Sequence, residues 1–170
     1  MKNPKKIFSK AYDRYVEKIY RFVFLKVNSK EIAQDLTSET FLKGWEAFQQ
    51  RYEENAKKPI ENMQAFLYQI ARNLIVDHYR GKDNPAAIPD SGVIDPRSDI
   101  QQAASLRSDL DMVKQSLAGL KQEYQDVIIW HYLDDLPIRE VAKLLDRSEP
   151  TTRVLLSRAL KKLRNEIEEI

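Results

Sequence analysis

Apolar residues recur at spacings of three and four in three stretches of the N-terminal half, and this periodicity predicts amphipathic helices. The first stretch covers about residues 7–27, and the Asn-Ser pair at 28–29 interrupts it. The second begins near Lys30, and the third begins near Asn62, a residue suited to cap a helix N-terminus. The expected core positions are Phe8, Tyr12, Tyr15, Val16, Ile19, Phe22, Val23, Ile32, Leu36, Phe41, Trp45, Phe48, Phe66, Leu67, Ile70, Ala71, Leu74 and Ile75. Three such helices can bury a small shared core.

Two segments lack this periodicity. Residues 49–61 contain Pro59 and predict a loop. Residues 81–98, with the sequence GKDNPAAIPDSGVIDPRS, hold three prolines, each of which lacks an amide donor and disfavours helix in the residue before it. The sequence therefore predicts a flexible linker at residues 83–98, between one domain at residues 1–82 and a second at residues 99–170.

Helical spacing returns in the second domain. One predicted face carries Leu106, Leu110, Val113 and Leu117. Gly119 is expected to end that helix. Residues 121–133 contain a Val-Ile-Ile run that resembles a strand in isolation, but no turn chemistry or partner strand is nearby, so we expect a helix. The predicted fold class is all-α, with two small helical domains.

The last third of the chain predicts a helix-turn-helix. Pro137 is suited to a first helical position, and Ala142 is small, as a close helix crossing requires. Ser148 is a good N-cap for a second helix that continues to Leu163. The positions expected to face inward, at least in part, are Val154, Leu155, Leu156, Ala159, Leu160 and Leu163. The positions expected outside are Thr151, Thr152, Arg153, Ser157, Arg158, Lys161 and Lys162. Such a helix enters the DNA major groove, although a plain helical hairpin with a basic surface gives the same pattern.

Charge adds to this picture through its distribution. The net charge is only +2, but residues 1–82 hold 16 Lys and Arg against 10 Asp and Glu, and residues 83–112 hold 2 against 6. Residues 147–164 hold six basic side chains and one acid. Two basic segments separated by an acidic one are typical of polyanion binding at two places, although charge scatter on helix surfaces can produce the same arrangement.

Composition excludes several classes of site. The chain has no Cys, which rules out disulfides and cysteine metal sites. His78 and His131 are far apart, and no Gly-rich phosphate loop is present, so the sequence predicts neither an enzyme nor a cofactor or metal site. No apolar run approaches the ~20 residues of a membrane span, and no secretion signal is evident. We therefore expect no membrane insertion and a cytoplasmic location.

Three motifs together resemble one family, the bacterial extracytoplasmic-function (ECF) RNA polymerase sigma factors. AQDLTSETFLKGW is similar to region 2.2 of that family, and FLYQIARNLIVDHYR is similar to regions 2.3 and 2.4. LKQEYQDVIIWHYLDDLPIREVAKLLDRSEPTTRVLLSRALKKLR is similar to region 4. The order and spacing are those of the family, and the resemblance covers about residues 8–164.

The resemblance implies a sigma factor that directs core RNA polymerase to promoters. Its partners would be core polymerase, through the clamp helices and flap, and promoter DNA, with an anti-sigma protein as a further candidate. The polymerase-binding residues would be Asp35, Ser38 and Glu39. The residues that bind the −10 element would be Arg72, Asn73, Asp77 and Arg80. Tyr52, Tyr68 and Tyr79 are candidates to stack on bases, or else to pack in the core or at the surface.

The same resemblance places Thr151, Thr152, Arg153, Ser157 and Arg158 against the −35 element. The recognition helix departs from the family pattern in part. Pro150 replaces a usual Gly, and Val154 and Leu155 replace a usual Ser-Arg pair. We therefore expect either an unusual −35 sequence or weak dependence on it.

Two other functions remain open at this point. A dimeric helix-turn-helix regulator that binds DNA without polymerase explains residues 136–164 but not the motifs of the first domain. A decoy that binds and sequesters polymerase explains the altered recognition helix.

Overall fold

The computed structural model describes residues 3–27, 29–54, 60–81 and 105–168, with side chains in the last range from residue 111 onward. Three long helices form the N-terminal bundle: α1 (Pro4–Lys26), α2 (Lys30–Glu53) and α3 (Met63–Gly81). Every described element is helical, which confirms the all-α fold class. The predicted linker at residues 83–98 lies outside the described residues.

Side-chain caps begin all three helices. The oxygen atoms of Asn3, Ser29 and Asn62 accept from the backbone amides of Lys5, Ile32 and Ala65 at 3.0, 3.0 and 2.9 Å. Each cap satisfies one of the amides that a helix N-terminus leaves without a partner. The predicted start of α3 at Asn62 is therefore confirmed, and so is its physical cause.

Aromatic side chains join the upper part of α1 to α2. The ring centre of Phe8 lies 6.3, 5.5 and 5.8 Å from those of Phe41, Trp45 and Phe48. Tyr12 was expected in this core, but its side chain is 46% exposed and only the edge of its ring meets Phe41, at 4.8 Å between centres. Tyr12 therefore lies at the edge of this core, whereas Phe8, one turn nearer the N-terminus, lies inside it.

The predicted loop at residues 49–61 begins too early. Helix α2 continues to Glu53, and the side-chain amides of Gln49 and Gln50 donate to Glu53 and Glu54 at 3.2 Å each. Pairs four residues apart stabilise a helix without any apolar stripe. Hydrophobic periodicity alone therefore missed this last turn and a half.

Five elements form the C-terminal bundle: α4 (Ser105–Ala118), α5 (Gln122–Val127), η2 (Ile128–Leu133), α6 (Ile138–Leu145) and α7 (Glu149–Glu168). Helix α4 ends just before Gly119, as predicted. The Val-Ile-Ile run lies in helix rather than strand, also as predicted. Helices α6 and α7 form the expected helix-turn-helix, and Asp146 turns the chain between them with a left-handed φ of 54°.

The sequence did not predict that η2 is a π-helix. Its amide bonds reach one residue further back than in an α-helix, as in the 3.0 Å bond from the amide of Asp134 to the carbonyl of Ile129. Ile128, Ile129 and Trp130 of this element are all buried, in continuation of the buried residues at the end of α5.

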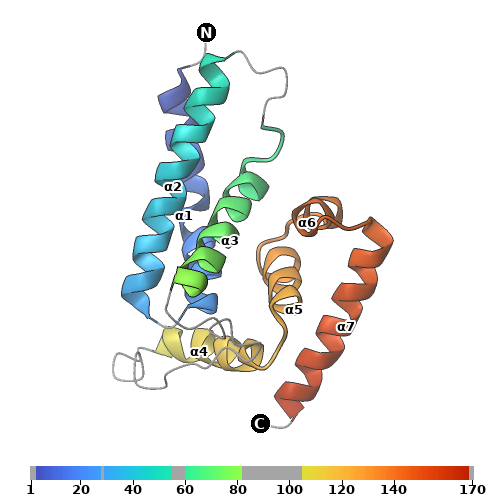
Figure 1. Ribbon diagram of the computed structural model, residues 1–170. Coiled ribbons are helices and arrows are strands. Elements are labelled where there is room, and N and C mark those ends of the chain that lie inside the picture. The colour runs from blue at the N-terminus through green and yellow to red at the C-terminus, as the bar shows by residue number, and fades with distance from the viewer. Residues whose placement is uncertain (1–2, 28, 55–59, 82–104, 169–170) are drawn as a thin grey trace.

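The two bundles touch. Helix α5 lies between α3 and α7, and α4 crosses the lower end of the N-terminal bundle (Figure 1). The ring centre of Trp130 in η2 lies 5.6 Å from that of Phe22 in α1 and 5.9 Å from that of Tyr68 in α3. All three side chains are fully buried, so one hydrophobic core runs through both bundles.

Candidate polymerase and nucleic-acid interfaces

The outward face of α2 carries the residues predicted to bind polymerase. Asp35, Ser38 and Glu39 are exposed and, being three and four residues apart, lie on one stripe of the helix. Within the described part of the chain they have one ion-pair partner, Lys43, whose ammonium lies 3.7 Å from the Glu39 carboxylate at the surface. Such an exposed pair holds the carboxylate only weakly, so the acidic stripe is available to a basic partner.

Leu42 also lies on this stripe, which was not predicted from the sequence. Its side chain is 58% exposed, and it follows Ser38 and Glu39 by four and three residues. A leucine in an amphipathic helix is normally assigned to the core. In the sequence, the one indication that Leu42 is exposed was its spacing of three and four residues from Glu39 and Ser38. An apolar side chain beside acids is typical of the centre of a protein interface.

Close packing of the opposite face fixes how α2 presents this stripe. A Cβ atom added to Gly44 would lie 3.0 Å from Leu67 of α3 and 3.3 Å from Phe8 of α1. The hydroxyls of Thr37 and Thr40 donate to backbone carbonyls four residues earlier, at 2.6 and 2.7 Å. These two threonines are thereby buried without an orphan polar group, and the acids are left outside.

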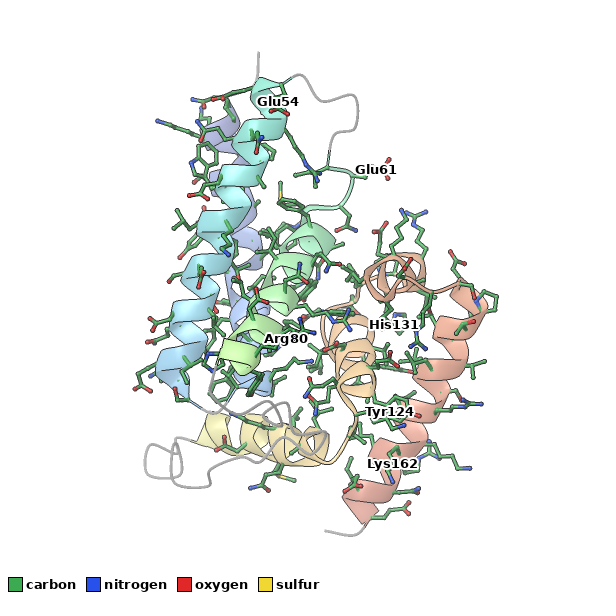
Figure 2. The ribbon with its side chains drawn as sticks, in the orientation of Figure 1. Glu54, Glu61, Arg80, Tyr124, His131 and Lys162 are labelled. Carbon is green, nitrogen blue, oxygen red and sulfur yellow. The ribbon has the colours of Figure 1, made fainter. Side chains whose placement is uncertain are left out.

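Helix α3 holds the residues predicted to bind the −10 element. Arg72, Asn73, Asp77 and Arg80 line one open hollow of about 460 Å³ together with Val76. Arg80 lies near the C-terminal end of α3 (Figure 2). The hollow offers guanidinium donors for phosphate and an amide that can both donate to and accept from a base edge.

Two of these side chains have partners within the chain. The Asn73 side-chain oxygen accepts from Gln69 at 3.2 Å, and the Asn73 side chain is exposed. Arg72 instead turns toward the C-terminal bundle, where its Nε lies 3.2 Å from Asp126 Oδ2 and its Nη1 donates to the Leu144 carbonyl at 3.4 Å. The structure therefore brings the four residues together, but the Arg72 guanidinium binds Asp126 and the Leu144 carbonyl of the C-terminal bundle.

Two of the three tyrosines proposed for base stacking are core residues. Tyr68 donates to the Asp134 carboxylate, and Tyr79 donates to the Lys26 carbonyl. Burial raises the pKa of both phenols. Tyr52 keeps a side chain that is 38% exposed, packed beside Phe48. The spacing of these tyrosines along amphipathic helices could not distinguish the buried ones from the exposed one.

The recognition helix α7 begins as predicted. The Ser148 hydroxyl oxygen accepts from the amide of Thr151 at 3.2 Å and thus caps the helix. Thr151, Arg153, Ser157 and Arg158 are exposed along the following two turns. Arg153 is 3.6 Å from Glu149 across one turn, a surface pair that phosphate can displace. Lys162 lies further along the same helix (Figure 2).

Thr152 and Val154 have environments opposite to those predicted from the sequence. Thr152 was expected outside, but it is fully buried and its hydroxyl donates to the Ser148 carbonyl at 2.8 Å. Val154 was expected to face inward, but its side chain is 49% exposed, on the face of Thr151 and Arg158. A threonine can be buried in the first turn because its hydroxyl reaches a backbone carbonyl there. Thr152 is therefore withdrawn from the DNA-facing set, and Val154 joins it.

Within the described ranges, no three His, Asp or Glu side chains lie close enough together to hold a metal ion. Nor does any helix described there have the length and apolar character to cross a membrane.

Two family models match the chain. The model for sigma-70 region 2 matches residues 11–84, and the model for sigma-70 region 4 matches residues 110–163. Among curated proteins, the chain is 27% identical over 157 residues to the ECF RNA polymerase sigma factor SigM of Bacillus subtilis, covering 90% of each chain. This chain belongs to the ECF sigma factor family.

A second curated member of the family differs in length. The chain is 27% identical over 168 residues to the ECF RNA polymerase sigma factor BldN of Streptomyces coelicolor, which covers 92% of this chain but only 58% of BldN. In sequence, the chain is therefore similar to ECF sigma factors across both bundles.

Two solved structures share the fold. The structure of CnrH in complex with the cytosolic domain of CnrY matches with a TM-score of 0.71 at 18% identity, covering 97% of this chain and 90% of that one. The sigma factor RpoE in complex with the anti-sigma factor NepR from Bartonella quintana also matches at 0.71, with 21% identity and coverages of 96% and 98%. At these identities the likeness concerns the arrangement of helices.

Proposed function

We propose that this ECF sigma factor binds core RNA polymerase and directs it to specific promoters. One observation supports this proposal most directly. The chain matches both sigma-70 regions and has three separate exposed surfaces. They are the acidic stripe of α2, the α3 hollow and the exposed side of α7. A regulator that acts without polymerase has no need of the first two.

Each surface has a distinct task in this proposal. Asp35, Ser38, Glu39 and Leu42 dock on the clamp helices of polymerase, where acids match a basic partner and Leu42 adds an apolar contact. The α3 hollow, with Arg72, Asn73, Asp77 and Arg80, holds a base and the backbone of the melted −10 element. Thr151, Arg153, Val154, Ser157 and Arg158 read the −35 element, with α7 in the major groove.

We further propose the division into a region 2 domain at residues 1–82, a linker at 83–98 and a region 4 domain at 99–170. The two family matches, at residues 11–84 and 110–163, support it.

Sigma factors are non-enzymatic regulators, and we propose no catalytic residue and no cofactor here. A role with polymerase on the chromosome places the protein in the cytoplasm. An anti-sigma protein is a further proposed partner, supported by the relative RpoE that was solved with one.

Run-off transcription tests the function directly. Purified core polymerase is given a library of promoter fragments with and without this protein. We expect transcripts that require the protein and share two sequence elements. Stable binding to core without transcripts would favour a decoy that sequesters polymerase. Shifted DNA without any binding to core would identify a regulator that acts alone.

Val154 gives a sharper prediction for the −35 element. An exposed apolar side chain beside Thr151 and Arg158 can contact the 5-methyl group of a thymine. Replacing the contacted thymine with deoxyuridine removes this methyl group. Binding of the promoter by polymerase with this protein bound should then weaken about fourfold, because burial of a methyl-sized group contributes about 0.8 kcal/mol. Val154→Ala should abolish that difference in a filter-binding titration.

Ile167 supplies the matched control, because it is 53% exposed on the same helix but lies more than three turns further along. Ile167→Ala should keep the full sensitivity to the methyl group. If no thymine in the element shows a methyl effect in the native protein, Val154 does not read the sequence.

A further inference from the structure

One acidic side chain lies within the basic recognition segment. Residues 147–164 hold six basic side chains and a single acid, which is Glu149. It is the first residue of α7, the helix at the right-hand edge of the molecule (Figure 1). A helix in the major groove brings the side chains of its N-terminal residues to base edges, so this carboxylate would lie against DNA. The −35 contacts proposed above leave Glu149 without a task.

The roles that Glu149 has within the chain are small ones. A carboxylate at a helix N-terminus interacts favourably with the helix dipole, and Glu149 also pairs with Arg153 one turn later. Both interactions are exposed to solvent and contribute little to stability. On a surface that meets phosphates, a negative charge opposes binding. The position is therefore better explained by a DNA group that requires a hydrogen-bond acceptor.

The positions of Glu149 and Arg153 are complementary to one base pair. Glu149 Oε2 lies 3.6 Å from Arg153 Nη2, and the two side chains are 47% and 62% exposed. In a C·G pair the cytosine N4 amino group and the guanine O6 atom are also neighbours, joined by a hydrogen bond of about 2.9 Å. The two side chains thus present an acceptor beside a donor, at a spacing close to that at which C·G presents a donor beside an acceptor.

The chemistry of the major-groove edge decides which base the carboxylate can bind. A carboxylate offers only acceptors. Cytosine presents only a donor there, whereas guanine and thymine present acceptors and adenine presents an acceptor beside its amino group. Glu149 therefore matches cytosine and is repelled by an acceptor on each of the other three bases. Arg153 is the side-chain type that donates two bonds to guanine, the partner of cytosine.

We propose that Glu149 determines specificity within the −35 element: it accepts from the N4 amino group of a cytosine, while Arg153 donates to the paired guanine. The inference rests on the proposed sigma-factor function, because it concerns promoter DNA bound by polymerase with this protein. The acid lowers the affinity for other sequences and so raises the ratio between correct and incorrect promoters. Repulsion of wrong partners is an effective source of specificity.

Base-pair substitutions in the −35 element test the assignment. Each position of an element found by run-off transcription is changed to all four base pairs. A filter-binding titration then measures the affinity of polymerase with the full-length protein bound. We expect one position at which C·G binds about tenfold more tightly than any other pair, as for a base contact of ordinary strength.

Glu149→Gln should change the preferred base at that position alone. An amide both accepts and donates, as adenine does, so A·T should become the best pair there and the preference for C·G should be lost. Arg153→Ala should reduce the preference for C·G at the same position to about threefold or less, because the guanine contact is removed. Glu168→Gln is the matched control, since it removes the same charge from an exposed position near the other end of α7 and should leave every preference unchanged.

Two results would overturn the proposal. An equal change in affinity at every base pair in Glu149→Gln, with native helix content by circular dichroism, would mean that Glu149 only stabilises α7 or holds Arg153. Effects of the two variants at different base pairs would exclude a shared reading of C·G. A failure of run-off transcription would instead overturn the sigma-factor function, and the same substitutions would then be made in DNA that the protein binds alone.

Discussion

We expect the double variant Asp35→Lys, Glu39→Lys to lose core-dependent transcription. Both carboxylates are exposed on the α2 stripe, so the variant would present two lysines to a surface that the proposal requires to be basic. Placing like charges opposite each other costs several kcal/mol, and each 1.4 kcal/mol is tenfold in affinity. The dissociation constant for core polymerase should therefore rise by at least about 100-fold, as measured by fluorescence anisotropy of labelled protein.

Stability should hardly change in this variant, because among the described residues the ion pair that it removes is the surface contact between Glu39 and Lys43, worth about 0.3–0.5 kcal/mol. Asp13→Lys on α1 is the matched control: another exposed acid is reversed, away from the stripe, and binding to core should stay within about twofold. Native affinity in the double variant would mean that polymerase docks elsewhere on the protein.

The second large effect is on stability. Trp130→Ala should lower the free energy of unfolding by about 3–5 kcal/mol, because it removes a fully buried ring between Phe22, Tyr68 and the Arg72 guanidinium. Chemical denaturation in urea, followed by circular dichroism, measures the change. Trp130→Phe should cost less, since it refills most of the cavity and also removes the unsatisfied indole nitrogen.

Tyr132→Ala controls for any general effect on the π-helix. Tyr132 is two residues away and 52% exposed, so its loss should cost no more than about 0.5 kcal/mol. Equal losses at positions 130 and 132 would contradict the inward placement of Trp130 and the shared core of the two bundles.

Local chemistry determined most of the secondary structure. The caps at Asn62 and Ser148 begin helices where the sequence predicted them, because a side-chain oxygen beside unpaired amides is a local interaction. The motifs of both regions were likewise evident in contiguous stretches of sequence. The end of α2 was missed because polar pairs, rather than an apolar stripe, extend it.

Finer placement on a helix surface depended on packing. Thr152 and Val154 exchange their expected environments, since a first-turn hydroxyl can bond within its own helix and a valine can be left outside. The exposure of Leu42 was missed because residue type predicts burial only on average. Leucines are usually buried, and functional surfaces are where exposed ones are expected.

The sequence by itself determined the helical class, the helix starts and the family of this protein, because each depends on residues that are close together in the chain. Only the tertiary structure decided that Lys26 and Arg72 meet Asp126, and that Arg21 and Tyr68 meet Asp134. These partners lie 54 to 113 residues apart, and each charge taken alone is indistinguishable from a solvated surface residue. Their pairing follows from how the two bundles pack, and no local pattern of residues encodes it.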